Sequence, residues 1–315
     1  MANLSSADFH CDVLWKLLKD PTLSFEQDAT LALDVTLPRL RQARSVLQTF
    51  AIYVSERMEQ SMIPILRSID LFHRKVLTAP DMTFIRTSDD AAKLQSSGKI
   101  GAMLSLEGVD GLGGDLAMLR ILFALGVRAV GLTWNHANWA ADGVMEPRGG
   151  GLTKKGRALV EECNRLGILV DVSHLSDRAF WDVLHISTKP VIASHSNCRA
   201  LCPHPRNLAD DQLAALLAAG GMVGVTFVPH FVASHQPAQI ADVLRHIERI
   251  CELGGREQLM FGSDFDGIEE YVHGLAHPGE VVQLQKALLS HYSESTAAGF
   301  CSGNLLQFLV KHLPE

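Results

Sequence analysis

The chain has 315 residues, of which 47% are hydrophobic and 20% charged, and its net charge at pH 7 is −7. This composition excludes a disordered chain, and the dispersed Lys and Arg residues exclude the basic stripe that neutralises nucleic-acid phosphates. Closed α/β barrels commonly reach this length as one unit. We therefore expect a single globular domain over residues 1–315 that does not bind nucleic acid.

The first eight residues have neither the basic nor the apolar segment of a secretory signal. No later run reaches the ~18 apolar residues of a membrane-spanning helix. Six cysteines are too few in a chain of this length for a disulfide framework. We therefore expect a cytoplasmic protein without membrane contact, whose cysteines are free thiols.

Short apolar runs rich in Val, Ile and Phe alternate with longer stretches of helical periodicity, a pattern typical of βαβ units. In chain order, the predicted strands are Asp8–Val13, Leu47–Val54, Gly101–Leu106, Arg128–Thr133, Ile168–Ser173, Pro190–Ser194, Met222–Val228 and Leu259–Ser263. The predicted helices are Glu56–Val76, Leu116–Leu125, Lys154–Leu166, Ala179–Ile186, Asp210–Ala219, Ala238–Leu253, Pro278–Ser290 and Ser295–Leu313. Eight strands with intervening helices predict a parallel (β/α)8 TIM-like barrel, and a doubly wound open sheet is the alternative.

In such a barrel the active site lies at the C-terminal ends of the strands. Six of the eight predicted strands end in possible ligands or acid–base groups: His10-Cys11-Asp12, Glu107, Trp134-Asn135-His136, His174, His195 and Asp264. The side chains of His10 and Asp12 share one face of an extended strand, because side chains alternate with period two. A carboxylate such as Glu107 after an apolar run is costly to desolvate unless it is paired or binds a cation.

Three imidazoles and two carboxylates at one barrel mouth suit zinc or a similar divalent ion: His10, Asp12, Glu107, His174 and His195. Five ligands exceed the needs of one tetrahedral ion, so the simplest arrangement has two ions bridged by one carboxylate, Glu107. Asp264 could then accept a proton from metal-bound water. The alternatives are hydrogen-bonded core histidines and a structural Asp-Gly turn, which suits Asp266 better than Asp264.

Seven ordered motifs resemble the membrane (renal) dipeptidase family of binuclear zinc peptidases. They are His10-x-Asp12, Ser105-Leu106-Glu107-Gly108, Leu132-Thr133 with Asp142, the run from Leu166 to His174, Pro190 to Ser196, Arg206 to Asp211 and Gly262 to Gly267. The resemblance implies one zinc on His10 and Asp12, a second on His174 and His195, and Glu107 between them.

The same resemblance implies that Asp264 handles the proton and that Arg206, with Asn207 beside it, binds the substrate's C-terminal carboxylate. A planar, permanently charged guanidinium suits that task. The resemblance also implies tolerance of a C-terminal D-residue and a homodimer.

The chain departs from the family pattern at two positions. Trp134 stands where a histidine that contacts substrate is expected, and Val228 stands where a tyrosine is expected. We expect His136 to take the histidine's role, because two residues along an extended segment restore the same facing. The alternative is that His136 lies outside the pocket while Trp134 packs against a substrate side chain.

Together these features predict a zinc-dependent dipeptidase in which hydroxide bridging two zinc ions attacks the amide carbonyl of a dipeptide. Two alternatives stay open. One is a related amidohydrolase acting on a non-peptide amide or a lactone, and the other is a non-catalytic metal-dependent binding protein. Asp264 argues against the last, because binding alone requires no proton acceptor beside the metals.

Overall fold

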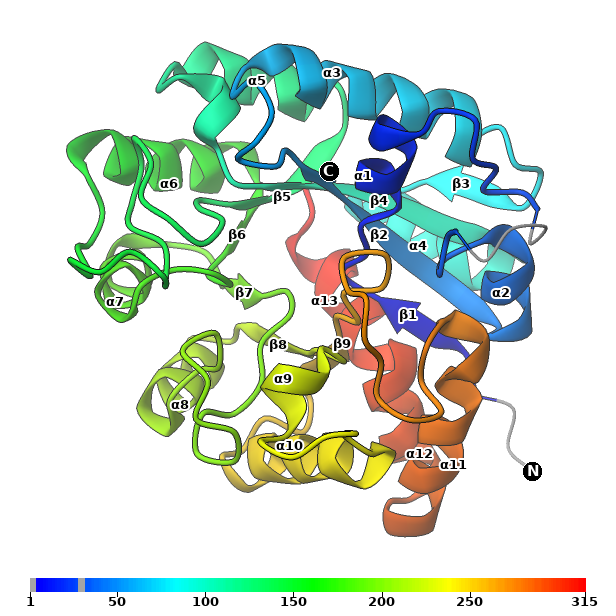
Figure 1. Ribbon diagram of the computed structural model, residues 1–315. Helices are drawn as coiled ribbons and strands as arrows, with labels where there is room; N and C mark the ends of the chain where they lie inside the picture. The colour runs from blue at the N-terminus through cyan, green and yellow to red at the C-terminus, as the bar shows by residue number, and fades with distance from the viewer. Residues whose placement is uncertain (1–3, 28–31) are drawn as a thin grey trace.

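A closed parallel barrel forms the centre of the computed structural model, which describes residues 4–27 and 32–315 (Figure 1). The first three residues of the N-terminal segment considered above lie outside the described residues. The strand order is β2-β1-β9-β8-β7-β6-β5-β4-β3, and the additional pairing of β2 with β4 closes eight strands into a ring, with β3 outside it. The strands are β1 Ser6–Asp8, β2 Ser45–Tyr53, β3 Met82–Phe84, β4 Ile100–Glu107, β5 Val127–Gly131, β6 Leu169–Asp171, β7 Ile192–Ala193, β8 Met222–Val225 and β9 Leu259–Phe261. The structure confirms the predicted (β/α)8 barrel.

Helices surround this ring, as Figure 1 shows. They are α1 Val13–Lys19, α2 Leu37–Gln42, α3 Met62–Leu71, α4 Ser88–Ser97, α5 Leu116–Ala124, α6 Lys154–Leu166, α7 Asp177–Ile186, α8 Asp210–Ala218, α9 Pro229–Val232, α10 Ile240–Glu252, α11 Val281–His291, α12 Glu294–Ala298 and α13 Asn304–His312. Helix α6 matches its prediction at both ends. The Thr153 side chain caps its first turn by accepting from Gly156 N–H, and Gly167 ends it in the left-handed region at φ 77°.

Several predicted boundaries were wrong. The first strand ends at Asp8, and α1 begins at Val13 where the prediction still had a strand, because a seven-residue helix has too few turns for its period to stand out. Strand β3, which has only three residues, and helices α2 and α4 were not predicted from the sequence. The helix predicted from Glu56 begins at Met62, after the Ser61 side chain caps its first turn.

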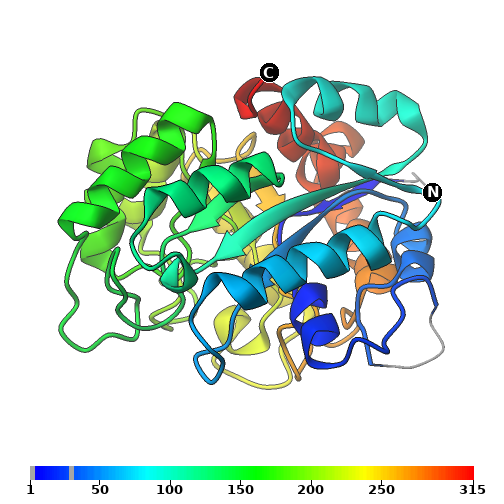
Figure 2. The ribbon, with the colours of Figure 1, turned by 90° about the horizontal axis from the view of Figure 1, so that it is seen from above.

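One end of the barrel is closed by α13, which lies beside α4 (Figure 2). Leu305 and Leu309 of this helix form one buried cluster with Leu47, Met103 and Leu169 of the strands. Burial of this much apolar surface stabilises the ring from its N-terminal end. The polar mouth at the opposite end is therefore the open one.

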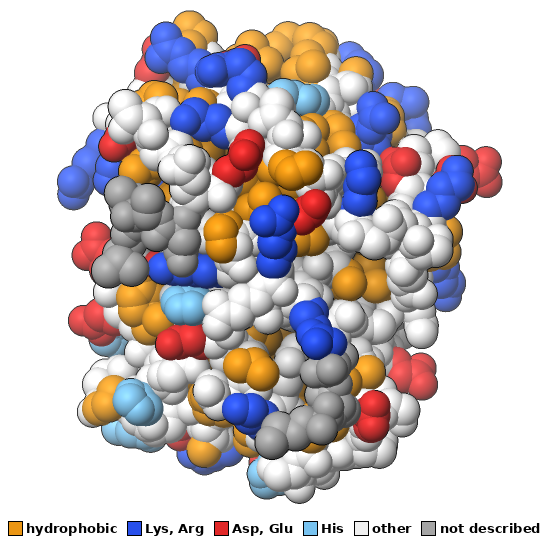
Figure 3. Space-filling view, turned by 90° about the vertical axis from the view of Figure 1, so that its right-hand side faces the viewer, with side chains coloured by type: hydrophobic (Ala, Val, Ile, Leu, Met, Phe, Trp, Pro, Cys, Tyr) orange, Lys and Arg blue, Asp and Glu red, His pale blue; other side chains and the backbone are white. Residues whose placement is uncertain are grey.

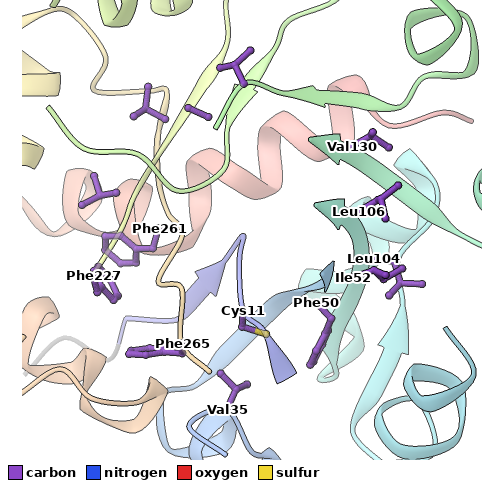
Figure 4. Close-up of a cluster of buried hydrophobic side chains, with 14 of the residues drawn as sticks. Cys11, Val35, Phe50, Ile52, Leu104, Leu106, Val130, Phe227, Phe261 and Phe265 are labelled. Atoms are coloured by element: carbon purple, nitrogen blue, oxygen red, sulfur yellow. The ribbon is translucent and has the colours of Figure 1, made fainter. Parts of the chain in front are cut away.

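A second and larger cluster of buried side chains includes three phenylalanines near the ends of β8 and β9 (Figure 4). The ring of Phe227 lies 5.7 Å from that of Phe261 and 5.8 Å from that of Phe265, centroid to centroid. All three rings are almost completely buried. The chain on either side of Asp264 is thus anchored by aromatic packing.

On the surface shown in Figure 3, basic, acidic and hydrophobic side chains are interspersed. Within residues 4–27 and 32–315, the structure has no helix with the length and apolarity needed to cross a bilayer. The six cysteines are free thiols, and all but Cys251 are buried.

Candidate active site

The five predicted metal ligands converge at the C-terminal mouth of the barrel, and all are buried or nearly so. Glu107 is central. Its Oε1 atom lies 2.8 Å from His174 Nε2 and 3.6 Å from His195 Nε2, while its Oε2 atom lies 3.8 Å from His10 Nε2. His10 Nε2 lies 3.5 Å from Asp12 Oδ2. The two carboxylate oxygens of Glu107 therefore face different histidines, Oε1 facing His174 and His195 and Oε2 facing His10.

The residues of this cluster fit a divalent cation. Both His10 Nε2 and Asp12 Oδ1 are buried without a hydrogen-bond partner, an arrangement that costs free energy unless another group satisfies them. Asp12 is the N-cap residue before α1, yet its side chain makes no capping hydrogen bond, so a helix-cap role does not explain it. A Cβ at Gly267 would lie only 2.4 Å from Asp12 Oδ2, so the absence of a side chain there keeps the space beside the carboxylates open.

The cluster is strongly coupled electrostatically. Burial opposes ionisation of Glu107, but His10, His174 and a nearby guanidinium hold its pKa at about 2. Burial likewise opposes protonation of His10, but the three carboxylates around it raise its pKa to about 10. Burial raises the pKa of Asp264 to about 8, reinforced by Asp12 and Glu107 and opposed by His10. A bound cation would replace protons as the positive charge among these carboxylates.

Asp264 is held beside the cluster in the left-handed region, at φ 69°, with its Oδ1 atom 3.7 Å from His10 Nε2. Its neighbours explain the strained conformation. Phe265 packs into the core, and the carboxylate of Asp266 accepts hydrogen bonds from the backbone N–H groups of Asp34 and Val35 at 2.8 and 2.9 Å. Asp266 thus has the structural role, and Asp264 is left free to point into the site.

His174 also has a positive φ, at 68°, as do Asp264 and Asp266. Its Nδ1 atom bonds Asn135 Oδ1 at 2.9 Å, so its Nε2 atom faces Glu107 and His195. Non-glycine residues in this region of φ cost free energy and gather at functional sites.

A cavity of about 440 Å³ opens above the cluster. Its lining combines apolar and aromatic side chains with polar ones. The polar residues are Asp12, Glu107, Asn135, His174, His204, Arg206 and Asp264. Arg206 is only 3% exposed, its Nε atom has no partner, and its guanidinium carbon lies 5.4 Å above the Phe231 ring. Burial lowers the pKa of Arg206 to about 10, opposed by Asp264 and Glu107, so it stays charged at neutral pH. An anionic group of a ligand would meet unpaired donors here.

The other residues predicted at the mouth of the barrel lie in different places. Trp134 lines the main cavity, and so does Val228. His136 does not join the cluster: its side chain is 54% exposed, 3.9 Å from Glu56, and lines a smaller neighbouring cavity of about 230 Å³. The turn after Trp134 directs Asn135, not His136, back into the site, because the chain there is no longer extended.

Asn207, predicted to bind substrate beside Arg206, does not line the cavity above the cluster. Asn207 is completely buried, and its Nδ2 group donates to the carbonyl oxygens of Cys202 and Phe231 at 2.9 and 2.8 Å. Its Oδ1 atom accepts from Asn197 N–H at 3.3 Å. Asn207 therefore holds together the loops that carry Arg206 and Phe231.

Several residues that line the cavity were not predicted from the sequence, among them Trp15, Tyr53 and His204. The Tyr53 ring lies 5.5 Å from that of Trp15 and 5.2 Å from that of Trp134, so the three rings form one aromatic wall. Asn135 also lines the cavity, as its place just after a predicted strand had indicated. Trp15 could not be found in this way, because it lies on a helix that was not predicted.

A parallel eight-stranded barrel with clustered His and carboxylate ligands at its C-terminal mouth defines the class of metal-dependent barrel hydrolases. The family model for membrane dipeptidases (peptidase family M19) matches residues 1–312, so the chain belongs to this family. Dipeptidase aclJ of Aspergillus oryzae is 35% identical over 89% of this chain and 70% of its own length. Dipeptidase tcpJ of Claviceps purpurea is 34% identical over 84% of this chain and 66% of its own length.

Solved structures agree with this assignment. The dipeptidase AC, a metallo peptidase of family M19, superposes with a TM-score of 0.92 and 30% identity, covering 100% of both chains. A metallo peptidase from Rhodobacter sphaeroides, liganded with a phosphinate mimic of the dipeptide L-Ala-D-Ala, superposes with a TM-score of 0.90 and 27% identity over 98% of this chain and 99% of its own. The protein is a metal-dependent dipeptidase of this family, which confirms the resemblance found in the sequence.

Proposed function

We propose that this dipeptidase uses two zinc ions, one held by His10 and Asp12, the other by His174 and His195, with Glu107 between them. The observation that carries the proposal is the orientation of Glu107, whose Oε1 and Oε2 atoms face the two histidine groups separately. Mixed imidazole and carboxylate ligands suit zinc. When bound, such ions lower the pKa of water and polarise a carbonyl oxygen.

The substrate's two ends meet different surroundings. Arg206 offers its free donors to the C-terminal carboxylate, and the planar fork permits two parallel hydrogen bonds. The aromatic wall of Trp15, Tyr53 and Trp134 receives an apolar side chain. Asp264 borders the same cavity, where its carboxylate accepts a proton and passes it to the leaving amine nitrogen.

We further propose that dipeptides with a D-residue at the C-terminal position are accepted. The Rhodobacter sphaeroides relative, whose structure holds a mimic of L-Ala-D-Ala, supports this extension. A homodimer and a cytoplasmic location stay predictions from the sequence.

The rival function is hydrolysis of a non-peptide amide or a lactone. It is favoured by Trp134 and Val228, which give the cavity apolar walls where substrate-contacting polar groups were expected. Arg206 discriminates between the two functions, because a substrate without a free carboxylate makes no use of a buried guanidinium.

The test is elemental analysis of the purified protein, combined with hydrolysis of matched L-L and L-D dipeptides with and without a chelator. The proposal expects about two zinc ions per chain and cleavage that the chelator abolishes. Two bound ions without dipeptide cleavage would favour the rival substrate class. A protein that binds no metal after reconstitution would refute the ligand assignment.

A further inference from the structure

Behind His195, away from the cavity, a buried carboxylate and a serine form a chain of hydrogen bonds that ends on the imidazole. Asp171, the last residue of β6, accepts the hydroxyl of Ser194 at 2.5 Å through Oδ2. Ser194 Oγ in turn lies 2.7 Å from His195 Nδ1. The other oxygen, Asp171 Oδ1, accepts the backbone N–H groups of Ser173 and Ser194 at 3.0 and 2.9 Å. All these groups are buried.

The direction of these hydrogen bonds follows from the chemistry of the groups. An ionised carboxylate only accepts, so the Ser194 hydroxyl proton points to Asp171. Ser194 Oγ then has only lone pairs to offer, and His195 Nδ1 must carry the proton that joins them. The neutral imidazole has one proton on its ring nitrogens, so the lone pair of His195 is on Nε2, facing Glu107.

His174 is oriented by a neutral group instead. Its Nδ1–H donates to Asn135 Oδ1, which leaves its own Nε2 lone pair free. The two Nε2 atoms lie 2.8 Å apart, and neither then has a proton to donate to the other. Two lone pairs at this separation, both beside Glu107 Oε1, call for a shared cation.

We propose that Asp171 and Ser194 form a relay that fixes the tautomer of His195 and strengthens it as a ligand, and so sets the affinity of the metal position shared by His174 and His195. The inference rests on the ligand assignment of the proposed function. Asp171 and Ser194 line neither cavity at the mouth and act only through His195, so they are positioning residues. Groups that orient metal-binding histidines in this way change metal affinity when they are removed.

A second carboxylate–serine pair shows what is particular to this relay. Asp8 accepts Ser263 N–H at 2.8 Å and the Ser263 hydroxyl at 2.5 Å, the same pattern on another pair of neighbouring strands. The next contact of Ser263 Oγ is the backbone oxygen of His10 at 3.1 Å, not its imidazole. Asp8 and Ser263 therefore bind only the backbone beside His10. Of the two pairs, only Asp171 and Ser194 contact the imidazole of a predicted metal ligand.

Two substitutions test the relay in different ways. Ser194→Ala removes the hydroxyl and leaves both backbone hydrogen bonds of Asp171 in place. Asp171→Asn keeps the shape but turns an acceptor into an amide donor facing Ser194. The Ser194 proton would then turn toward His195 Nδ1 and leave the ring proton on Nε2, where it blocks metal binding. Ser196→Ala is the matched control, because Ser196 is equally buried beside His195 but contacts Ser173 Oγ, not the imidazole.

The experiment measures zinc affinity of the full-length protein by competition with a chromophoric chelator, and the tautomer of His195 by ¹⁵N spectra of the metal-free protein. The His195 signal is assigned by its loss in His195→Gln. We expect one of two ions to bind about 10–100-fold more weakly in Ser194→Ala and Asp171→Asn, and Nε2–H to appear in Asp171→Asn. Ser196→Ala should match the wild type in both measurements.

The proposed relay would be refuted if Ser194→Ala and Asp171→Asn bound zinc as tightly as Ser196→Ala. The metal-ligand assignment would not be affected by that result. A wild type that binds no zinc would instead overturn the proposed function. If Asp171→Asn fails to fold, as circular dichroism would show, Ser194→Ala alone decides the question.

Discussion

Arg206→Met removes the guanidinium that lines the cavity above the cluster and keeps a long apolar side chain in its place. Arg206 Nε has no partner, and the one protein acceptor its guanidinium reaches among the described residues is His195 O, 3.4 Å from Nη2. The other terminal N–H groups of the guanidinium have no protein acceptor among the described residues, so a carboxylate in the cavity can accept from them.

The magnitude follows from those free donors. A hydrogen bond to a charged group is worth about 1.5–3 kcal/mol, so a bidentate pair with the carboxylate contributes about 3–6 kcal/mol. Since 1.4 kcal/mol corresponds to a factor of ten, kcat/KM for a dipeptide should fall by roughly 100- to 20,000-fold.

The assay compares a dipeptide with its own C-terminal amide. The wild type should prefer the free carboxylate strongly, and Arg206→Met should lose most of that preference. Arg120→Met is the control, because Arg120 pairs with Glu162 at 3.0 Å outside this cavity. Equal losses for the dipeptide and the amide in Arg206→Met would refute a carboxylate-binding role.

Three further predictions concern the proton carrier, the metal and acid stability. Asp264→Asn should lower kcat by about 10²–10⁴-fold with both metal ions retained by elemental analysis, and near-normal turnover would contradict its role. Removing the ions with a chelator should lower the melting temperature in calorimetry by about 10 °C, because each ion at a thousand times its Kd stabilises the fold by about 4 kcal/mol; an unchanged transition would count against buried ligands. Burial lowers the pKa of His246 from 6.5 to about 4, opposed by its hydrogen bond to Val232 O, so folding keeps the ring neutral. Its contribution is present above pH 6.5 and is lost, by up to about 3 kcal/mol, as the pH falls to 4. In urea unfolding, His246→Gln should therefore show a smaller loss over this range than the wild type, and identical pH profiles would exclude His246 as the cause.

Local patterns in the sequence were enough to predict the barrel and its mouth. Hydrophobic runs and helical periods reveal how often strand and helix alternate, and eight parallel strands close into one ring with all their C-terminal ends on the same side. Glu107, His174, His195 and Asp264 each follow such a strand, so they had to meet whatever route the connecting loops take. The same reasoning could not give the exact ends of the strands, because β1, β6 and β7 have only two or three paired residues.

Only the tertiary structure decided which side chains turn into the cavity once the strands have ended. Trp134 and Asn135 line the cavity, whereas the side chain of His136 points outward. The side chain of Asn207 makes its hydrogen bonds to the backbone of neighbouring loops. Beyond the end of a strand, the direction of a side chain depends on φ and ψ and no longer on simple alternation. The contact between Asp171 and Ser194 likewise joins residues 23 positions apart. It depends on the register of neighbouring strands, which is set by packing of the whole ring and leaves no trace in the spacing of residues along the chain.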